Sequence, residues 1–234
     1  MRAARPVVAA LLLAVGLGAC GGSGSSPAST SPSSSPASSS SASAICPKNS
    51  SDYRQPPSTL PTRSVALTTA KPPWAPPLLT APDKTGEYVT AAGLPCSEEM
   101  LQVHYHAHLD INVDGNPVVV PQYLGFVAEG DHVAGLAPLH THDNAGIIHI
   151  ENSVPAIFVL EQVFIEWGVK FTPKCLGPYC SGHGKELALF VNGSRYTGDP
   201  TKLVLKAHQE IALEYGDAGK LPKPPASYAF PSGL

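Results

Sequence analysis

The chain has 234 residues, only 14% of them charged, and its formal net charge at pH 7 is −3. No basic stripe runs along it, so nucleic acid is excluded as an expected partner. Residues 94–221 are enough for one ordinary hydrophobic core, and two or more domains would be crowded there.

The N-terminus has the pattern of a bacterial export signal. Arg2 and Arg5 precede an apolar run that is too short to span a bilayer as a mature helix. The run ends in Leu17-Gly18-Ala19-Cys20, which resembles the lipobox of bacterial lipoprotein signals. The resemblance implies removal of residues 1–19 and a fatty-acyl (palmitate-type) membrane anchor on Cys20, outside the cytoplasm. An ordinary secretory signal with an incidental cysteine is the alternative.

Composition divides the rest of the chain into four parts. Residues 20–44 follow with 13 Ser, cannot bury apolar surface, and predict a disordered tether. Residues 45–93 are Pro-rich and predict an extended arm that lies against the domain, not a second domain. We expect the His-rich globular domain at 94–221 and a C-terminal tail at 222–234.

Four cysteines remain after lipidation of Cys20, and an even number in an exported protein favours disulfides. Three pairings are possible. A Gly-Pro turn lies between Cys175 and Cys180 and favours a local bridge, which leaves Cys46 to pin the arm at Cys96.

The residue pattern of the globular domain predicts mainly strands. Polar and apolar residues alternate over 103–113, which places three histidines on one face and the apolar side chains on the other. Apolar spacing predicts one amphipathic helix at 160–167, ending at Gly168. Further strands are expected at 118–120, 147–150, 187–191, 203–205 and 210–215. This order predicts a compact α+β or mostly-β fold, a sheet of hairpins with one helix, with a β-grasp sheet as one candidate.

Seven of the nine histidines fall between residues 104 and 149, and six of these form three tight groups. The groups also hold two carboxylates. Their members are His104, His106 and His108; His140 and His142 with Asp143; and His149 with Glu151.

Histidines at i and i+2 on a strand can converge on one ion, but three in a row rarely can. We therefore expect two of the first group to bind, with one or two ligands from a neighbouring strand. Asp143 or Glu151 would be a ligand or would orient a histidine. The strand of His104 to His108 should lie beside, or across a cleft from, His140 and His142. Solvent-exposed histidines without a metal are the alternative.

The ligand set suits Zn²⁺, Cu²⁺, Ni²⁺ or Fe²⁺ and argues against Ca²⁺ or Mg²⁺. Cys180-Ser-Gly-His183 resembles the cysteine–histidine loop of blue-copper proteins, although the methionine ligand of that family is absent. A wider resemblance, to uncharacterised secreted bacterial proteins, rests on residues 104–111, 140–151 and 192–200. It implies no activity.

The leading hypothesis is a surface-anchored lipoprotein that binds a transition-metal ion, Zn or Cu, for capture, delivery or sensing. The second is a metal-dependent hydrolase or oxidoreductase that uses the same histidines, with Glu151 or Asp143 as base. The third is a pH-responsive interaction module without a metal. The sequence names no protein partner.

Overall fold

The structure, a computed structural model, describes Cys46, Trp74 and residues 85–99, 101–129 and 132–234. The predicted signal peptide, the tether with its lipidation site at Cys20, and most of the predicted arm lie outside these residues. Within the described part of the chain, no helix is both long enough and apolar enough to cross a membrane.

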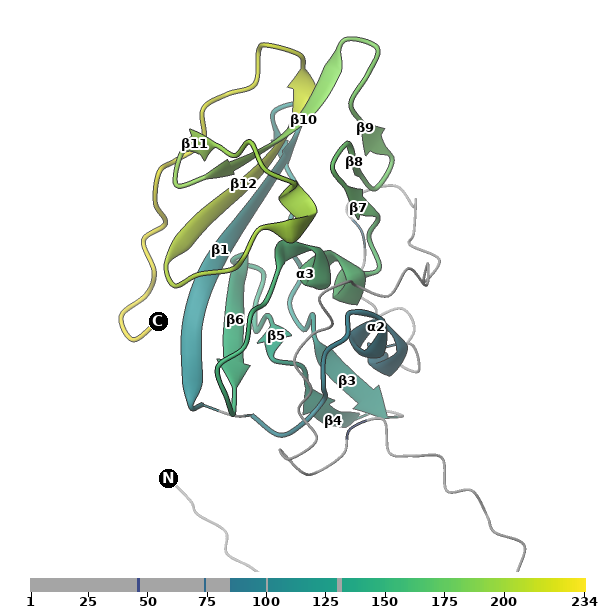
Figure 1. Cartoon of the computed structure of the whole chain (residues 1–234), viewed down its shortest axis with the longest axis vertical. Coiled ribbons are helices and arrows are strands. Elements are labelled where there is room, and N and C mark those ends of the chain that lie inside the picture. The colour runs from purple at the N-terminus through teal and green to yellow at the C-terminus, as the bar shows by residue number, and fades with distance from the viewer. Residues whose placement is uncertain (1–45, 47–73, 75–84, 100, 130–131) are drawn as a thin grey trace, which may run out of the picture. The chain divides into compact units, whose positions relative to one another are not determined.

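The main sheet has seven strands in the order β11-β10-β12-β1-β6-β5, and β2 pairs with β1 (Figure 1). β1 and β12 run parallel at its centre, and every other pair in it is antiparallel. The strands are β1 (Val103–Val113), β2 (Asn116–Pro117), β5 (Leu139–His140), β6 (Ile147–Asn152), β10 (Lys185–Val191), β11 (Ser194–Arg195) and β12 (Gln209–Asp217).

Two smaller sheets and three short helices complete the described fold. One sheet pairs β3 with β4, and the other is built from β7, β8 and β9. Their bounds are β3 (Phe126–Glu129), β4 (His132–Leu136), β7 (Phe171–Thr172), β8 (Cys175–Leu176) and β9 (Tyr179–Cys180). The helices are α2 (Thr85–Ala91), α3 (Leu160–Trp167) and the 3-10 helix η3 (Pro200–Lys202).

The core lies between one face of the main sheet and helix α3. The alternation predicted for β1 is confirmed, because Leu109 and Ile111 are at most 2% exposed in the same cluster as α3. The apolar stripe of α3 is also buried, and Gly168 ends the helix with a left-handed φ of 71°. A Cβ atom at Gly168 would lie 3.0 Å from the Tyr88 ring, so the helix ends where α2 packs against it.

The predicted fold class is confirmed: the described chain is mostly β with two short α-helices. The central parallel pair β1–β12 is flanked by antiparallel β6 and β10, and α3 lies in the connection between these two. This is the strand order of the β-grasp candidate.

Three local expectations were wrong. Helix α2 forms inside the predicted extended arm, because Thr85 and Val89 bury against the domain. Residues 203–205 form no strand beyond one bridge from Val204, since Pro200 and the cap at Asp199 start η3 just before them. No strand forms at 118–120, because β2 ends before these residues at Pro117 and Pro121 follows directly after them.

The two disulfides are Cys46–Cys96 and Cys175–Cys180, which is the pairing that the sequence favoured. Trp74 is 3% exposed, and its carbonyl oxygen accepts a hydrogen bond from Nε1 of Trp167 at 3.2 Å. The described points of the predicted arm therefore contact the core.

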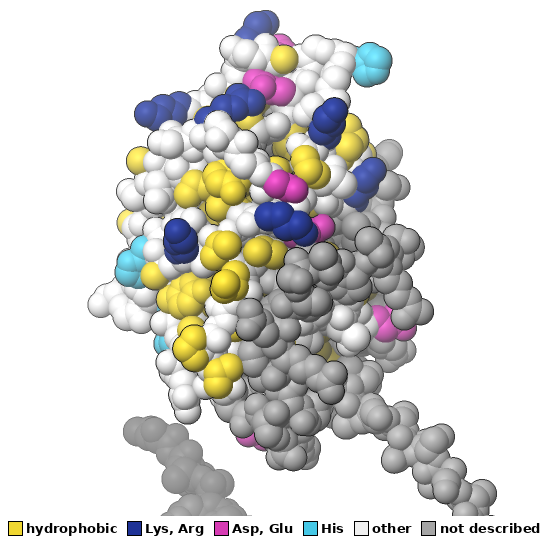
Figure 2. All heavy atoms as spheres, viewed as in Figure 1, with side chains coloured by type: hydrophobic (Ala, Val, Ile, Leu, Met, Phe, Trp, Pro, Cys, Tyr) yellow, Lys and Arg dark blue, Asp and Glu magenta, His cyan; other side chains and the backbone are white. Residues whose placement is uncertain are grey.

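The C-terminal segment covers part of the other face of the main sheet (Figure 1). Leu221 packs on Ala212, and the Tyr228 ring stacks on His108 with centroids 3.7 Å apart. The segment thus covers β12 and the middle of β1. On the face drawn in Figure 2, Lys and Arg side chains are scattered, several of them beside Asp or Glu, with no continuous basic stripe.

Ile150→Ala should destabilise the protein by about 2–5 kcal/mol, because it leaves a cavity beneath β6 where Ile150 is 0% exposed. Urea unfolding measures this loss. The matched control is Ile157→Ala at a 57% exposed position, which should change stability by no more than about 0.5 kcal/mol. Equal losses in the two variants would contradict the assigned face of β6.

Candidate metal centre

Strand β6 lies between β1 and β5 and brings the histidine groups together. His149 on β6 is the register partner of His106 on β1 and of His140 on β5. In the next row His104 faces Glu151. Directly opposed residues share a face of the sheet and have Cβ atoms about 4.5–5.5 Å apart. The sheet register therefore gathers three imidazoles in one row and adds an imidazole and a carboxylate in the next.

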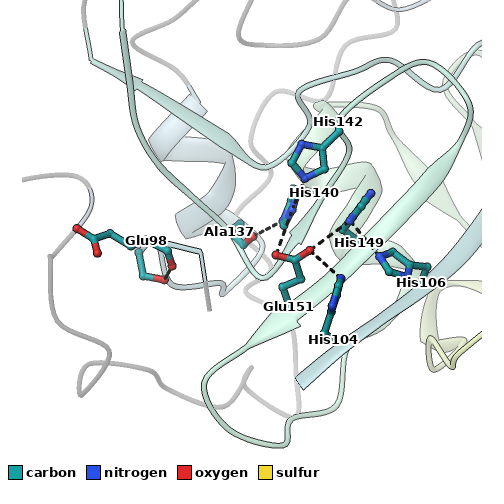
Figure 3. Close-up of polar contacts among 9 residues, drawn as sticks. Glu98, His104, His106, Ala137, His140, His142, His149 and Glu151 are labelled. Atoms are coloured by element: carbon teal, nitrogen blue, oxygen red, sulfur yellow. Dashed lines mark hydrogen bonds and ion pairs between the residues drawn. The ribbon is translucent and has the colours of Figure 1, made fainter. Parts of the chain in front are cut away.

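A fifth imidazole comes from the loop after β5. Nε2 of His142 lies 3.2 Å from Nε2 of His140. The Phe126 ring packs edge-on against both, with centroids 5.8 Å from His140 and 5.6 Å from His142. Contact with the Phe126 ring holds the His142 ring in place. Figure 3 shows that His142 is directed at the cluster.

The donor atoms lie at the spacing of metal ligands. Nε2 of His106 is 3.1 Å from Nδ1 of His149, and that nitrogen is 3.2 Å from Oε1 of Glu151. Nε2 of His104 is 3.4 Å from the same carboxylate oxygen. Ligands of one tetrahedral ion are about 3–3.5 Å apart when each bond is about 2.0–2.1 Å. The expected ligand spacing is therefore present.

His140 is oriented as a metal-binding histidine usually is. Its Nδ1 donates a hydrogen bond to the carbonyl oxygen of Ala137 at 3.0 Å. A carbonyl only accepts, so the proton of the neutral ring resides on Nδ1 and Nε2 presents a lone pair. Nε2 faces Oε2 of Glu151 at 3.7 Å (Figure 3). Such a backbone contact fixes the tautomer of a ligand.

Two buried imidazoles of the cluster, His106 and His140, are neutral beside an ionised carboxylate. Burial, followed by repulsion from His149, lowers the pKa of His106 to about 4. Burial also lowers the pKa of His140 to about 4. Burial alone would raise the pKa of Glu151, but the hydrogen bond from His149 and the nearby imidazoles lower it overall. At neutral pH His106, His140 and Glu151 therefore offer lone pairs without first losing protons.

One side of the cluster opens to solvent. His104 and His142 are exposed, whereas His106, His140 and Glu151 are at most 5% exposed. A small pocket adjoins His140 and Glu151, and its other lining residues are Ser97, Glu98, Glu99, Leu136, Ala137 and Pro138. An ion held here would remain accessible from outside.

Two of the predicted site residues, His108 and Asp143, lie outside the cluster. His108 has Nδ1 at 2.8 Å from Oε2 of Glu210 on β12 and Nε2 at 2.8 Å from the carbonyl oxygen of Ala145. Burial lowers its pKa, but the contact with Glu210 outweighs burial and raises it. Oδ1 of Asp143 accepts a hydrogen bond from the Ala145 amide at 2.8 Å and closes the turn before β6.

The structure thus brings together five of the six predicted histidines with Glu151, and the expectation that only two of the first three converge is met. The first group, on β1, and the second group, on β5 and its loop, lie on one face of the sheet with β6 between them, as expected. The blue-copper alternative is not supported, because Cys180 is bonded to Cys175. Sequence reasoning missed Ala137 and Phe126, because neither is a ligand type.

Comparison with protein-family models gives no match. Comparisons with curated proteins and with solved structures also give none.

The metal-free protein should lose stability as the pH falls from about 6.5 to about 4. His106 and His140 have folded pKa values of about 4, against a reference value of 6.5. Between these values the unfolded chain binds more protons, so stability rises with pH by at most about 1.4 kcal/mol per pH unit for each histidine. Thermal unfolding across this range measures the slope.

The control for this experiment is the double variant His106→Asn with His140→Asn. It lacks both titrating groups, so its stability should change less over the same pH range. An equal slope in the variant would contradict the assigned pKa values.

Proposed function

We propose that this protein is a lipid-anchored surface protein that binds a transition-metal ion, Zn²⁺ or Cu²⁺, for capture and delivery or sensing. The ligands come from one face of three neighbouring strands and the loop after β5. They are drawn from His104, His106, His140, His142, His149 and Glu151.

One observation carries the metal proposal. Oε2 of Glu151 is buried and has no hydrogen-bond partner. Nε2 of His140, which faces this oxygen, has no proton to donate, because that proton is on Nδ1. An anionic oxygen and a lone pair thus face each other at 3.7 Å, an arrangement that costs free energy unless a cation binds between them.

The donor set supports the choice of metal. Imidazole nitrogens with one carboxylate suit Zn²⁺ and Cu²⁺, whereas Ca²⁺ and Mg²⁺ prefer oxygen ligands. Met100 is the only methionine after residue 1, so a methionine-rich Cu(I) carrier is not supported. Exposure of His104 and His142 leaves two ligands free to exchange, which favours capture and delivery over a purely structural ion.

A metal-dependent hydrolase or oxidoreductase is the second candidate. The pocket beside His140 and Glu151 favours it, because a small molecule there would reach an ion held by these residues. The pH-responsive module has less support, since His106 and His140 have pKa values of about 4 and stay neutral between pH 5 and 7. Turnover of model esters or phosphoesters that depends on added metal would favour the enzyme.

Protein purified without a histidine tag and stripped with chelator should take up Zn²⁺ or Cu²⁺ and keep it through dialysis. His149→Asn removes the histidine at the centre of the row and should weaken affinity by at least about 10–100-fold, the loss typical of an outer-shell change. Mass-spectrometric metal analysis and competition titration measure both results.

The matched control is His183→Asn, which alters an exposed histidine at a positive-φ turn position that asparagine tolerates. Its affinity should equal that of the unaltered protein. Absence of bound metal in the unaltered protein, or equal losses in both variants, would refute the proposal.

The lipid anchor has its own test. In a bacterial host, the full chain should fractionate with membranes and incorporate labelled palmitate, because the lipobox places Cys20 at the cleavage site. Cys20→Ser should abolish labelling and move the protein to the soluble or secreted fraction. Ser23→Ala, three residues away, should leave both unchanged. Membrane retention of Cys20→Ser would contradict the anchor.

A further inference from the structure

The six donor residues form two overlapping groups. In each group, one donor atom per residue lies within 4.8 Å of all the others. The first group combines β1 with β6, and the second combines β5 and its loop with β6. The members of the first are His104, His106, His149 and Glu151, and those of the second are His140, His142, His149 and Glu151.

Glu151 presents a different oxygen to each group. Oε1 faces the β1 side, at 3.4 Å from Nε2 of His104, and accepts from Nδ1 of His149 at 3.2 Å. Oε2 faces the β5 side, at 3.7 Å from Nε2 of His140. Figure 3 shows the carboxylate between the two sets of imidazoles. This is the position that a bridging carboxylate occupies between two ions.

The buried oxygen Oε2 points independently to a second ion. Glu151 is 5% exposed, and Oε2 has no hydrogen-bond partner. An ion in the first group would satisfy Oε1, because the short contacts to His104 and His149 are made there. Oε2 would then still face the lone pair of His140 with no cation between them.

The number of available ligands also indicates a second ion. A tetrahedral ion takes four ligands, and the first group alone supplies four. His140 and His142 would then be left beside the site, with their Nε2 atoms 3.2 Å apart and both directed into the cluster. That separation is the spacing of two ligands on one ion.

We propose that the cluster holds two transition-metal ions bridged by Glu151, an inference that rests on the metal-binding function proposed above. The first ion binds His104, His106, His149 and Oε1. The second binds His140, His142 and Oε2. Paired ions of this kind lie about 3.5–4 Å apart. Nδ1 of His149 binds the first ion once its proton has moved to Nε2 of the same ring. The second ion then has three protein ligands and an open position, as catalytic metal ions have.

Metal stoichiometry tests the proposal on the full folded protein. Titration of the stripped, tag-free protein with Cu²⁺ should end at two ions per chain by mass spectrometry. At one equivalent the electron paramagnetic resonance spectrum should show an isolated Cu²⁺ signal. At two equivalents that signal should decrease and a half-field transition should appear, because two Cu²⁺ ions at this distance couple.

Two exposed histidines provide matched variants with little risk to folding. His104→Asn alters only the first group, and His142→Asn alters only the second. Each should weaken one binding step by at least about 10-fold and leave the other step unchanged. Circular dichroism and the thermal midpoint verify that both variants fold. Glu151→Gln should abolish the coupled signal.

The outcomes separate the two proposals. Two coupled ions support the bridged pair. One ion per chain, with both variants affecting the same step, overturns the pair and leaves single-ion binding intact. Two ions without coupling overturn the bridge. No bound ion overturns both this proposal and the metal-binding function.

Discussion

The register of β6 between its two neighbours decides whether the cluster of histidines and Glu151 can form. Ile148 and Ile150 are both 0% exposed in the core, while His149 and Glu151 point to the opposite face. A shift of one residue would bury the imidazole and the carboxylate among apolar side chains and bring the isoleucines to the other face. The apolar core therefore fixes the positions of the polar cluster, although the two share no side chain.

Much of the site could be predicted because its periodicity is local. Alternation along 103–113 placed His104 and His106 on a polar face, and the spacing of two residues placed His149 and Glu151 together on one face, before any strand pairing was known. The spacing of two residues identified possible ligand pairs. Only the pairing β1–β6–β5 was needed to bring these pairs together, and antiparallel neighbours close in sequence are the commonest arrangement.

The remaining features depend on contacts that no local pattern encodes. His108 leaves the cluster because β12, about a hundred residues further along, pairs in parallel with β1 and places Glu210 beside it. Helix α2 has only seven residues, too few for a strong apolar periodicity. Its burial against α3 stabilises it. The Ala137 carbonyl that orients His140 is a backbone group, and composition gives no sign of it.

The Cys46–Cys96 disulfide joins the N-terminal part of the chain to the rim of the pocket beside the histidine cluster. Cys96 precedes Ser97, whose amide and carbonyl pair with Leu136 at 2.9 Å, and both residues line the pocket beside Glu151. Gly135 lies so close that a Cβ there would meet Cys46 and Cys96 sulfur at 2.9 Å. The bond does not persist in a reducing compartment. Where the bond persists, it therefore ties Cys46 to the rim of the pocket beside Glu151.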